Sequence, residues 1–173
     1  MQGQDTAADS KLSALAEHPR SLRFNVKTGI KFEDQSAAIT ARRARVQFER
    51  GCLTEEFLMV AKFDSLDYTI LNAFSRKCFR HALRNRRIPL PWGWLALHFA
   101  TCYAVAMVPA TDSALTSSLT RSEPILRWWY GNEFPIVWDL STGCLYYPEA
   151  TLGYGRVADM QRRVALELLA PVA

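Results

Sequence analysis

Residues 65–87 read SLDYTILNAFSRKCFRHALRNRR, residues 88–91 read IPLP, and residues 92–108 read WGWLALHFATCYAVAMV. The first segment predicts a long helix, because its apolar and basic residues separate onto opposite sides at about 100° per residue. The apolar side carries Ile70, Leu71, Phe74, Cys78 and Ala82. The basic side carries Arg76, Lys77, Arg80, Arg84 and Arg87. We therefore expect one side to face a core and the other to present concentrated positive charge.

The proline-containing segment 88–91 predicts an elbow, and the apolar run after it predicts a second helix from Trp92 to Val108. This run contains His98 and Thr101 and is shorter than the ~20 apolar residues that span a bilayer comfortably. We therefore expect a buried core helix in a soluble, cytoplasmic protein without a membrane partner. A membrane-spanning helix is the alternative interpretation.

The N-terminal half predicts mostly helix after a polar start. Residues 1–20 have few apolar side chains and predict an N-terminal tail with one or two helical turns. Alternating residues on both sides of Lys27-Thr28-Gly29 predict a small hairpin. Two helices are then expected, one from Ala37 to Arg50 and a short apolar one from Phe57 to Phe63.

The C-terminal half carries the strongest hairpin signal in the chain. Phe134–Trp138 and Cys144–Tyr147 are rich in residues that favour strands, and Asp139–Gly143 between them suits a turn that ends in a left-handed glycine. A short helix through Leu115 and Leu119 is expected before it, and a last amphipathic helix, about Arg156 to Ala170, after it.

Length and composition favour one domain. The chain has 173 residues, of which 49% are hydrophobic, and such a chain can bury its apolar surface in a single core. With the elements above, the sequence predicts an α+β fold: a mainly helical single domain, residues 21–173, with a small antiparallel β-hairpin sheet.

Clustered charge indicates the class of partner. The net charge is only +4, but the arginines gather locally, and local charge favours nucleic acid or an acidic protein surface. Binding to nucleic acid needs cations spaced to meet phosphates. The candidate nucleic-acid-binding residues are Arg76, Lys77, Arg80, Arg84 and Arg87. The alternative is that this basic side is only solvated surface.

The order of predicted elements also suggests a more specific role. A short helix, a tight corner near Phe63 to Ser65 and a basic helix make the outline of a helix-turn-helix. This favours a bacterial-type transcription regulator that binds DNA as a symmetric dimer. An adaptor or subunit of a larger assembly, such as a ribonucleoprotein, is the competing hypothesis, because it would use a basic face too.

Two groups of residues are candidates for a protein interface. Trp128, Trp129 and Tyr130 belong to residue types that are common in interface hot spots, although aromatic residues beside strands usually form a second core. Phe79 and Leu83 lie beside the basic arc on the helical wheel and offer apolar surface to a neighbouring helix or a second subunit.

Catalysis has little support in the sequence. His98 and Cys102 would lie one helical turn apart, the minimum for an activated thiol, but both lie in the most apolar run and no third group orients them. The four cysteines lack the Cys-x-x-Cys spacing of a zinc site or redox pair. We expect a non-enzymatic protein without metal or cofactor; an enzyme with scattered catalytic residues is the third alternative.

One short segment resembles a known family. Residues 86–95, RRIPLPWGWL, follow the basic helix and resemble the segment after the helix-turn-helix of FlhC-type bacterial transcription activators. The resemblance covers about ten residues of low specificity, and the cysteine cluster near the end of those proteins is absent here. It therefore implies no functional residue in this sequence.

Overall fold

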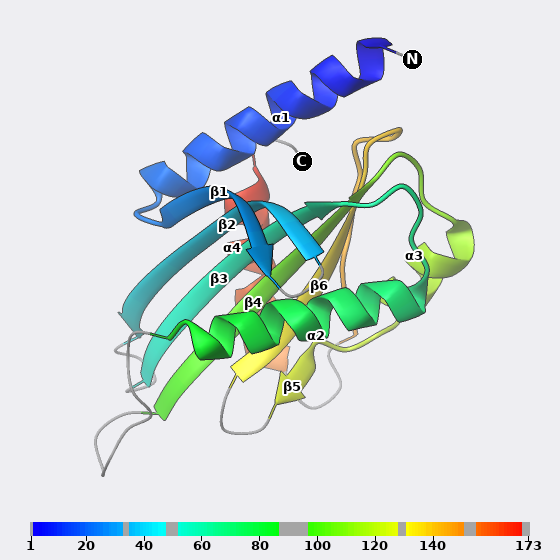
Figure 1. The fold of residues 1–173 in the computed structure, drawn as a ribbon. Helices are drawn as coiled ribbons and strands as arrows, with labels where there is room; N and C mark the ends of the chain where they lie inside the picture. Colours follow the sequence, from blue (N-terminus) through cyan, green and yellow to red (C-terminus); the bar gives the residue numbers. More distant parts are fainter. Residues whose placement is uncertain are drawn as a thin grey trace.

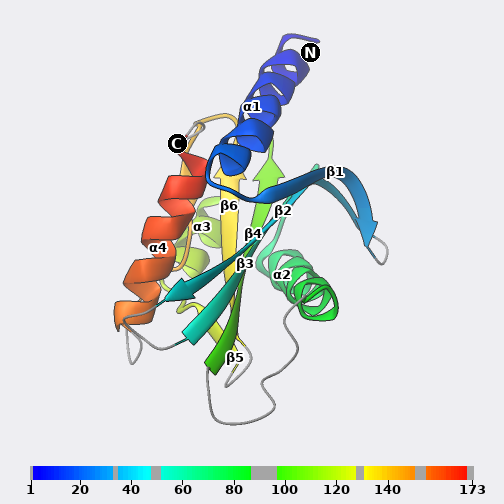
Figure 2. The same cartoon turned by 90° about the vertical axis from the view of Figure 1, so that its left-hand side faces the viewer.

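A mixed β-sheet forms the centre of the protein, with helices on both of its faces (Figures 1 and 2). The computed structural model describes residues 2–32, 35–47, 52–86, 97–127, 131–150 and 155–170. In chain order the elements are α1 Gln2–Ser21, β1 Asn25–Phe32, β2 Gln35–Gln47, β3 Cys52–Lys62, α2 Tyr68–Arg84, β4 Leu97–Val108, α3 Ser113–Thr120, β5 Ile125–Arg127, β6 Gly131–Asp139, β7 Leu145–Tyr146 and α4 Gly155–Leu169.

The sheet combines antiparallel and parallel pairs. Its strand order is β1-β2-β3-β4-β6-β5, and β7 pairs with the other end of β6. β1, β2 and β3 are antiparallel neighbours, whereas β3, β4 and β6 run parallel. Parallel neighbours need a crossover connection, and α2 lies in the connection from β3 to β4.

Two apolar clusters fill the space between the sheet and the helices. The cluster under α1 and α4 includes Leu58, Tyr103 and Phe134. The cluster under α2 and α3 includes Phe74 and Leu119. Both faces of the central strands are therefore buried.

This architecture is α/β, so the prediction of a mainly helical α+β fold with a small hairpin sheet is wrong. Three predicted helices are strands: residues 37–50 and 57–63 lie largely in β2 and β3, and the described part of 92–108 lies in β4. Central strands buried on both faces read as continuous apolar runs without alternation. A short apolar run of this kind cannot be distinguished from a buried helix by its periodicity.

Several predicted elements are confirmed. α2 begins after Asp67, whose side chain accepts a hydrogen bond from the backbone N–H of Ile70 at 2.7 Å. Of the predicted apolar side of α2, Ile70 is exposed, and the other four residues are buried: Leu71, Phe74, Cys78 and Ala82. The hairpin of β6 and β7 turns through Gly143, which has a φ of 73°. The helices expected near Leu115 and at the C-terminus are α3 and α4.

The N-terminal segment differs from expectation. We expected residues 1–20 to be a tail with one or two helical turns, but residues 2–21 form α1. Leu15 and Ala16 near its C-terminal end are buried against the sheet. The turn expected at Lys27–Gly29 lies inside β1, which pairs with β2 as one strand. No helix within the described ranges is long and apolar enough to cross a membrane.

Candidate functional site

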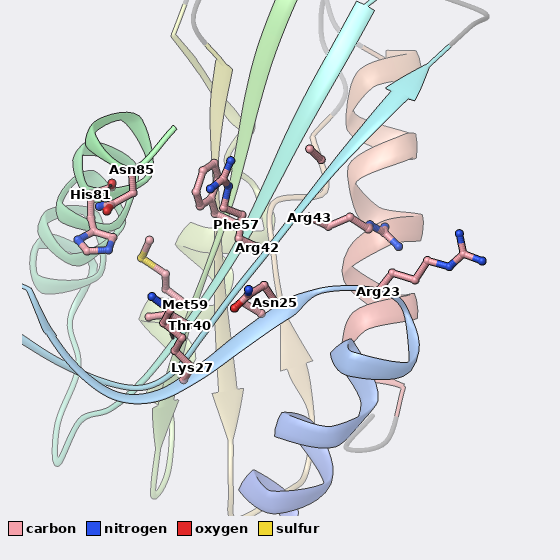
Figure 3. Close-up of a pocket in the computed structure, with 12 residues that line it drawn as sticks. Arg23, Asn25, Lys27, Thr40, Arg42, Arg43, Phe57, Met59, His81 and Asn85 are labelled. Carbon is pink, nitrogen blue, oxygen red and sulfur yellow. Dashed lines mark hydrogen bonds between the residues drawn. The ribbon is translucent and has the colours of Figure 1, made fainter. Parts of the chain in front are cut away.

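A groove of about 470 Å³ opens between the C-terminal end of α2 and the strands β1 and β2 (Figure 3). Its basic lining side chains are Arg23, Lys27, Arg42, Arg43 and His81. Neutral polar side chains line it at Asn25, Thr40 and Asn85, and apolar ones at Phe57 and Met59. None of the described residues that line the groove is acidic.

The walls of the groove come from distant parts of the chain. Figure 3 shows His81 and Asn85 on α2 across from Thr40 and Met59 on the sheet, with Arg23 at the far end beside the start of β1. Arg23 and Lys27 are exposed to solvent. A volume of this size falls in the range of small-molecule and nucleotide sites, about 300–1,000 Å³.

Two of the arginines that line the groove, Arg42 and Arg43, form ion pairs with buried glutamates. Arg42 bonds to Glu55 on one face of the sheet, and Arg43 bonds to Glu56 on the other. The two faces follow from strand geometry, since successive side chains of β2 and β3 point to opposite sides. Glu55 and Glu56 are 0% and 1% exposed, so each arginine already compensates one buried carboxylate. Arg42 and Arg43 therefore bring less net charge to the groove than Arg23 and Lys27.

Further buried polar side chains lie at the end of the sheet that holds Glu55 and Glu56. Of the nine buried polar side chains in the described part of the chain, six lie where β3, β4 and β6 begin: Thr54, Glu55, Glu56, Thr101, Asn132 and Glu133. Glu133 accepts a hydrogen bond from the hydroxyl of Ser75 on α2 at 3.2 Å. Thr101, Asn132 and Gln161 of α4 contain five buried polar atoms without any hydrogen-bond partner. Each such atom costs about 1–3 kcal/mol of folding free energy, so this end is not optimised for stability alone.

Burial also shifts the pKa of two side chains, one in α2 and one just after it. The pKa of Cys78 is raised, first by burial and then by the neighbouring Cys102 side chain. A raised thiol pKa keeps Cys78 protonated, and a protonated thiol is a poor nucleophile. Burial lowers the pKa of Arg86, an effect that the charge of Glu55 opposes.

The structure describes four of the five residues predicted to bind nucleic acid. Arg76, Arg80 and Arg84 are exposed on α2, Lys77 is half-buried, and Arg87 lies outside the described residues. Lys77, Arg80 and Arg84 each interact with neighbouring groups. On a helix with 100° per residue, Lys77 and Arg84 lie within about 60° of His81, so the basic side of α2 continues from the wall of the groove.

The residues predicted for a protein interface lie differently. Phe79 is 5% exposed and belongs to the core under α2, and the partly buried Leu83 packs against the same core. Neither offers the free apolar surface that a second subunit would need. Trp128, Trp129 and Tyr130 lie outside the described residues.

Two structural premises of the sequence interpretation are corrected. The helix expected before α2 is the strand β3, so the helix-turn-helix outline does not exist. His98 and Cys102 lie on the strand β4, where four residues span about 13 Å of backbone, so the two residues are not one helical turn apart. Cys102 itself is fully buried.

Arg23 and Lys27, the exposed cations of the groove, were not found from the sequence, because they line the groove only where β1 pairs with β2. Within the described ranges no three His, Cys, Asp or Glu side chains are placed to hold a metal ion. The sequence matches no protein-family model, and neither a curated protein nor a solved structure shows significant similarity to it.

Proposed function

We propose that this protein binds nucleic acid without catalysing a reaction, through the groove and the adjoining basic side of α2. The observation that carries the proposal is the groove lining: five basic side chains, Arg23, Lys27, Arg42, Arg43 and His81, and no acidic one among the described residues. A concave surface of one sign of charge concentrates counter-charged ligands.

The geometry favours a polyanion over a single small anion. Arg76, Arg80 and Arg84 follow one another on the exposed side of α2 at steps of about 6 Å, since each helical residue rises about 1.5 Å. Lys77 and Arg84 connect this line to His81 at the wall of the groove. A phosphate backbone that runs along α2 would thus meet cations on the helix and then in the groove.

The neutral side chains of the groove add a second reason. Asn25, Thr40 and Asn85 carry hydrogen-bond donors and acceptors, the groups that read the edges of unpaired bases. The Thr40 hydroxyl donates to the carbonyl oxygen of Lys27 and the Asn85 amide to that of His81, so these two side chains have their oxygen atoms and the second amide hydrogen of Asn85 left for a base. The groove volume of about 470 Å³ holds a nucleotide and is too small for a duplex. We therefore propose single-stranded nucleic acid as the ligand.

The experiment is a fluorescence-anisotropy titration of labelled single-stranded DNA and RNA oligonucleotides with the purified chain. Binding should weaken steeply between about 50 and 200 mM salt, because each neutralised phosphate releases counterions. An acidic protein surface is the competing partner, and polyglutamate serves as its probe. If polyglutamate binds as tightly as the oligonucleotides, or if no oligonucleotide binds at low salt, the proposal is wrong.

A further inference from the structure

Arg42 lies in the floor of the groove, on the side of the sheet that faces α2. In the antiparallel register of β1, β2 and β3, Asn25 is the partner of Arg42, and Arg42 is the partner of Phe57. Side chains of such partners project to the same face of a sheet, and Phe57 belongs to the core under α2. Figure 3 shows Arg42 beside Phe57 in this part of the groove.

The guanidinium of Arg42 covers an aromatic ring. Its Cζ atom lies over the ring of Phe57, 5.7 Å from the ring centroid. Phe57 lines the groove and yet is only 3% exposed. A ligand in the groove therefore meets the guanidinium of Arg42 before it meets the ring.

An ion pair holds the same guanidinium in place. Arg42 pairs with Glu55, whose side chain is fully buried, whereas the Arg42 side chain is 21% exposed. The carboxylate occupies an edge of the planar group, and the Phe57 ring lies against one of its faces. The opposite face of the guanidinium is thus the part that is left for a ligand in the groove.

A fixed guanidinium of this kind suits a base better than a phosphate. The charge of Arg42 is compensated by Glu55, so its net attraction for a phosphate is small. Its flat face can still stack, and unpaired bases stack on guanidinium planes as they do on aromatic rings. A purine has two fused rings and covers more of such a face than a pyrimidine, which has one ring.

We propose that Arg42, backed by Phe57, is the stacking platform for one base of the bound strand and makes the groove select purines. This inference rests on the proposed function, because it concerns the same ligand in the same groove. Asn25, the register partner of Arg42, is exposed and forms no hydrogen bond with another described residue. Its carboxamide is therefore free to bond to the edge of the stacked base.

The test measures how the variant Arg42→Lys and the wild type bind two labelled DNA strands of equal length, one with adenine only and one with thymine only. Lysine keeps the positive charge but has no flat face. The ratio of the two affinities, adenine strand over thymine strand, should be about fivefold smaller in the variant, because one stacked base is lost. The slope of log K against log salt should stay the same. Stacking within the free strands cancels when the two proteins are compared.

The matched control is the double variant Arg23→Gln/Lys27→Gln, which removes charge from the groove and keeps the platform. It should weaken the binding of both strands alike, reduce the salt slope and leave the affinity ratio unchanged. Equal ratios in the wild type and Arg42→Lys would overturn the stacking platform, while salt-dependent binding would still support the proposed function. If neither strand binds at low salt, both proposals are wrong.

NMR supplies a readout that does not need a variant to fold. The Nε atom of Arg42 is buried, so its hydrogen should exchange slowly enough with water to be observed. A purine stacked on the guanidinium should shift this signal upfield through its ring current, and the thymine strand should shift it less. An Arg42 signal that the bound adenine strand leaves unchanged would also overturn the platform.

Discussion

Arg43 donates from Nε to Oε2 of Glu56 at 2.8 Å, and it also donates from Nη1 to the backbone carbonyl oxygen of Leu22 at 3.0 Å. One guanidinium thus joins β2 to β3 and to the segment between α1 and β1. The same group lies 4.4 Å from the centre of the Phe24 ring. Because Arg43 also lines the groove, the wall of the groove and the position of α1 depend on one ion pair.

Removal of the buried Glu56 carboxylate should therefore lower the free energy of unfolding. Glu56→Ala leaves Arg43 without its compensating charge, and we expect the free energy of unfolding to fall by about 3 kcal/mol in urea denaturation. The control is Glu17→Ala, which removes the exposed pair with Arg20 and should cost at most about 0.5 kcal/mol. Equal losses in the two variants would show that the Arg43–Glu56 pair contributes no more than a surface pair.

Gly131 should tolerate no side chain. Its φ is +144°, and a Cβ atom would lie 1.8 Å from the carbonyl oxygen of Ala100 in the neighbouring strand. Gly131→Ala should therefore force β4 and β6 apart and cost more than about 3 kcal/mol in denaturant unfolding.

Gly29→Ala is the matched control for Gly131→Ala. Gly29 also has a positive φ, +64°, but nothing lies within 4 Å of the added atom. It should cost only about 1–2 kcal/mol, from backbone strain alone. A variant Gly131→Ala as stable as Gly29→Ala would contradict the close approach of the two strands.

Asp139 should make stability depend on pH in the acid range. Burial on its own would raise the pKa of Asp139, but hydrogen bonds from Ser141, Thr111 and Thr142 outweigh it and hold the pKa well below its usual range. A depressed folded-state pKa contributes stability above the unfolded-state pKa of about 3.9, and this contribution is lost as the pH falls further.

The variant Asp139→Asn measures this contribution. Near neutral pH it should be about 2 kcal/mol less stable than the wild type in urea, because charge-assisted hydrogen bonds are lost. The difference should shrink below about pH 4, as the carboxylate takes up a proton in the unfolded wild-type chain while it stays ionised in the folded one. A difference that stays constant through the acid range would mean that the hydrogen bonds do not favour the ionised form.

The sequence predicted the local elements better than the sheet. α2, α3, α4 and the β6–β7 hairpin each carry a local signal, such as a capping aspartate, a helical apolar stripe or a turn glycine. The central strands β3 and β4 carry none, because both of their faces are buried and their apolar residues do not alternate. Their partners are also distant in sequence, so no local pattern identifies the pairing.

The candidate site was predictable only where it lies on one element. The basic side of α2 followed from helical periodicity, whereas Arg23 and Lys27 join the groove only after β1 and β2 pair. One signal was available and missed: the doublets Arg42-Arg43 and Glu55-Glu56 are opposite in charge and become near neighbours if their segments form antiparallel strands. A helical interpretation of both segments hid this complementarity.

The most direct test of the central claim is the salt dependence of oligonucleotide binding in the double variant Arg23→Gln/Lys27→Gln. The groove account predicts weaker binding and a slope of log K against log salt that is smaller in magnitude by about 1.4, for two lost contacts with a single strand. Lys31→Gln, an exposed lysine of β1 that does not line the groove, should behave like the wild type. A double variant with the affinity and salt slope of the wild type would contradict the account.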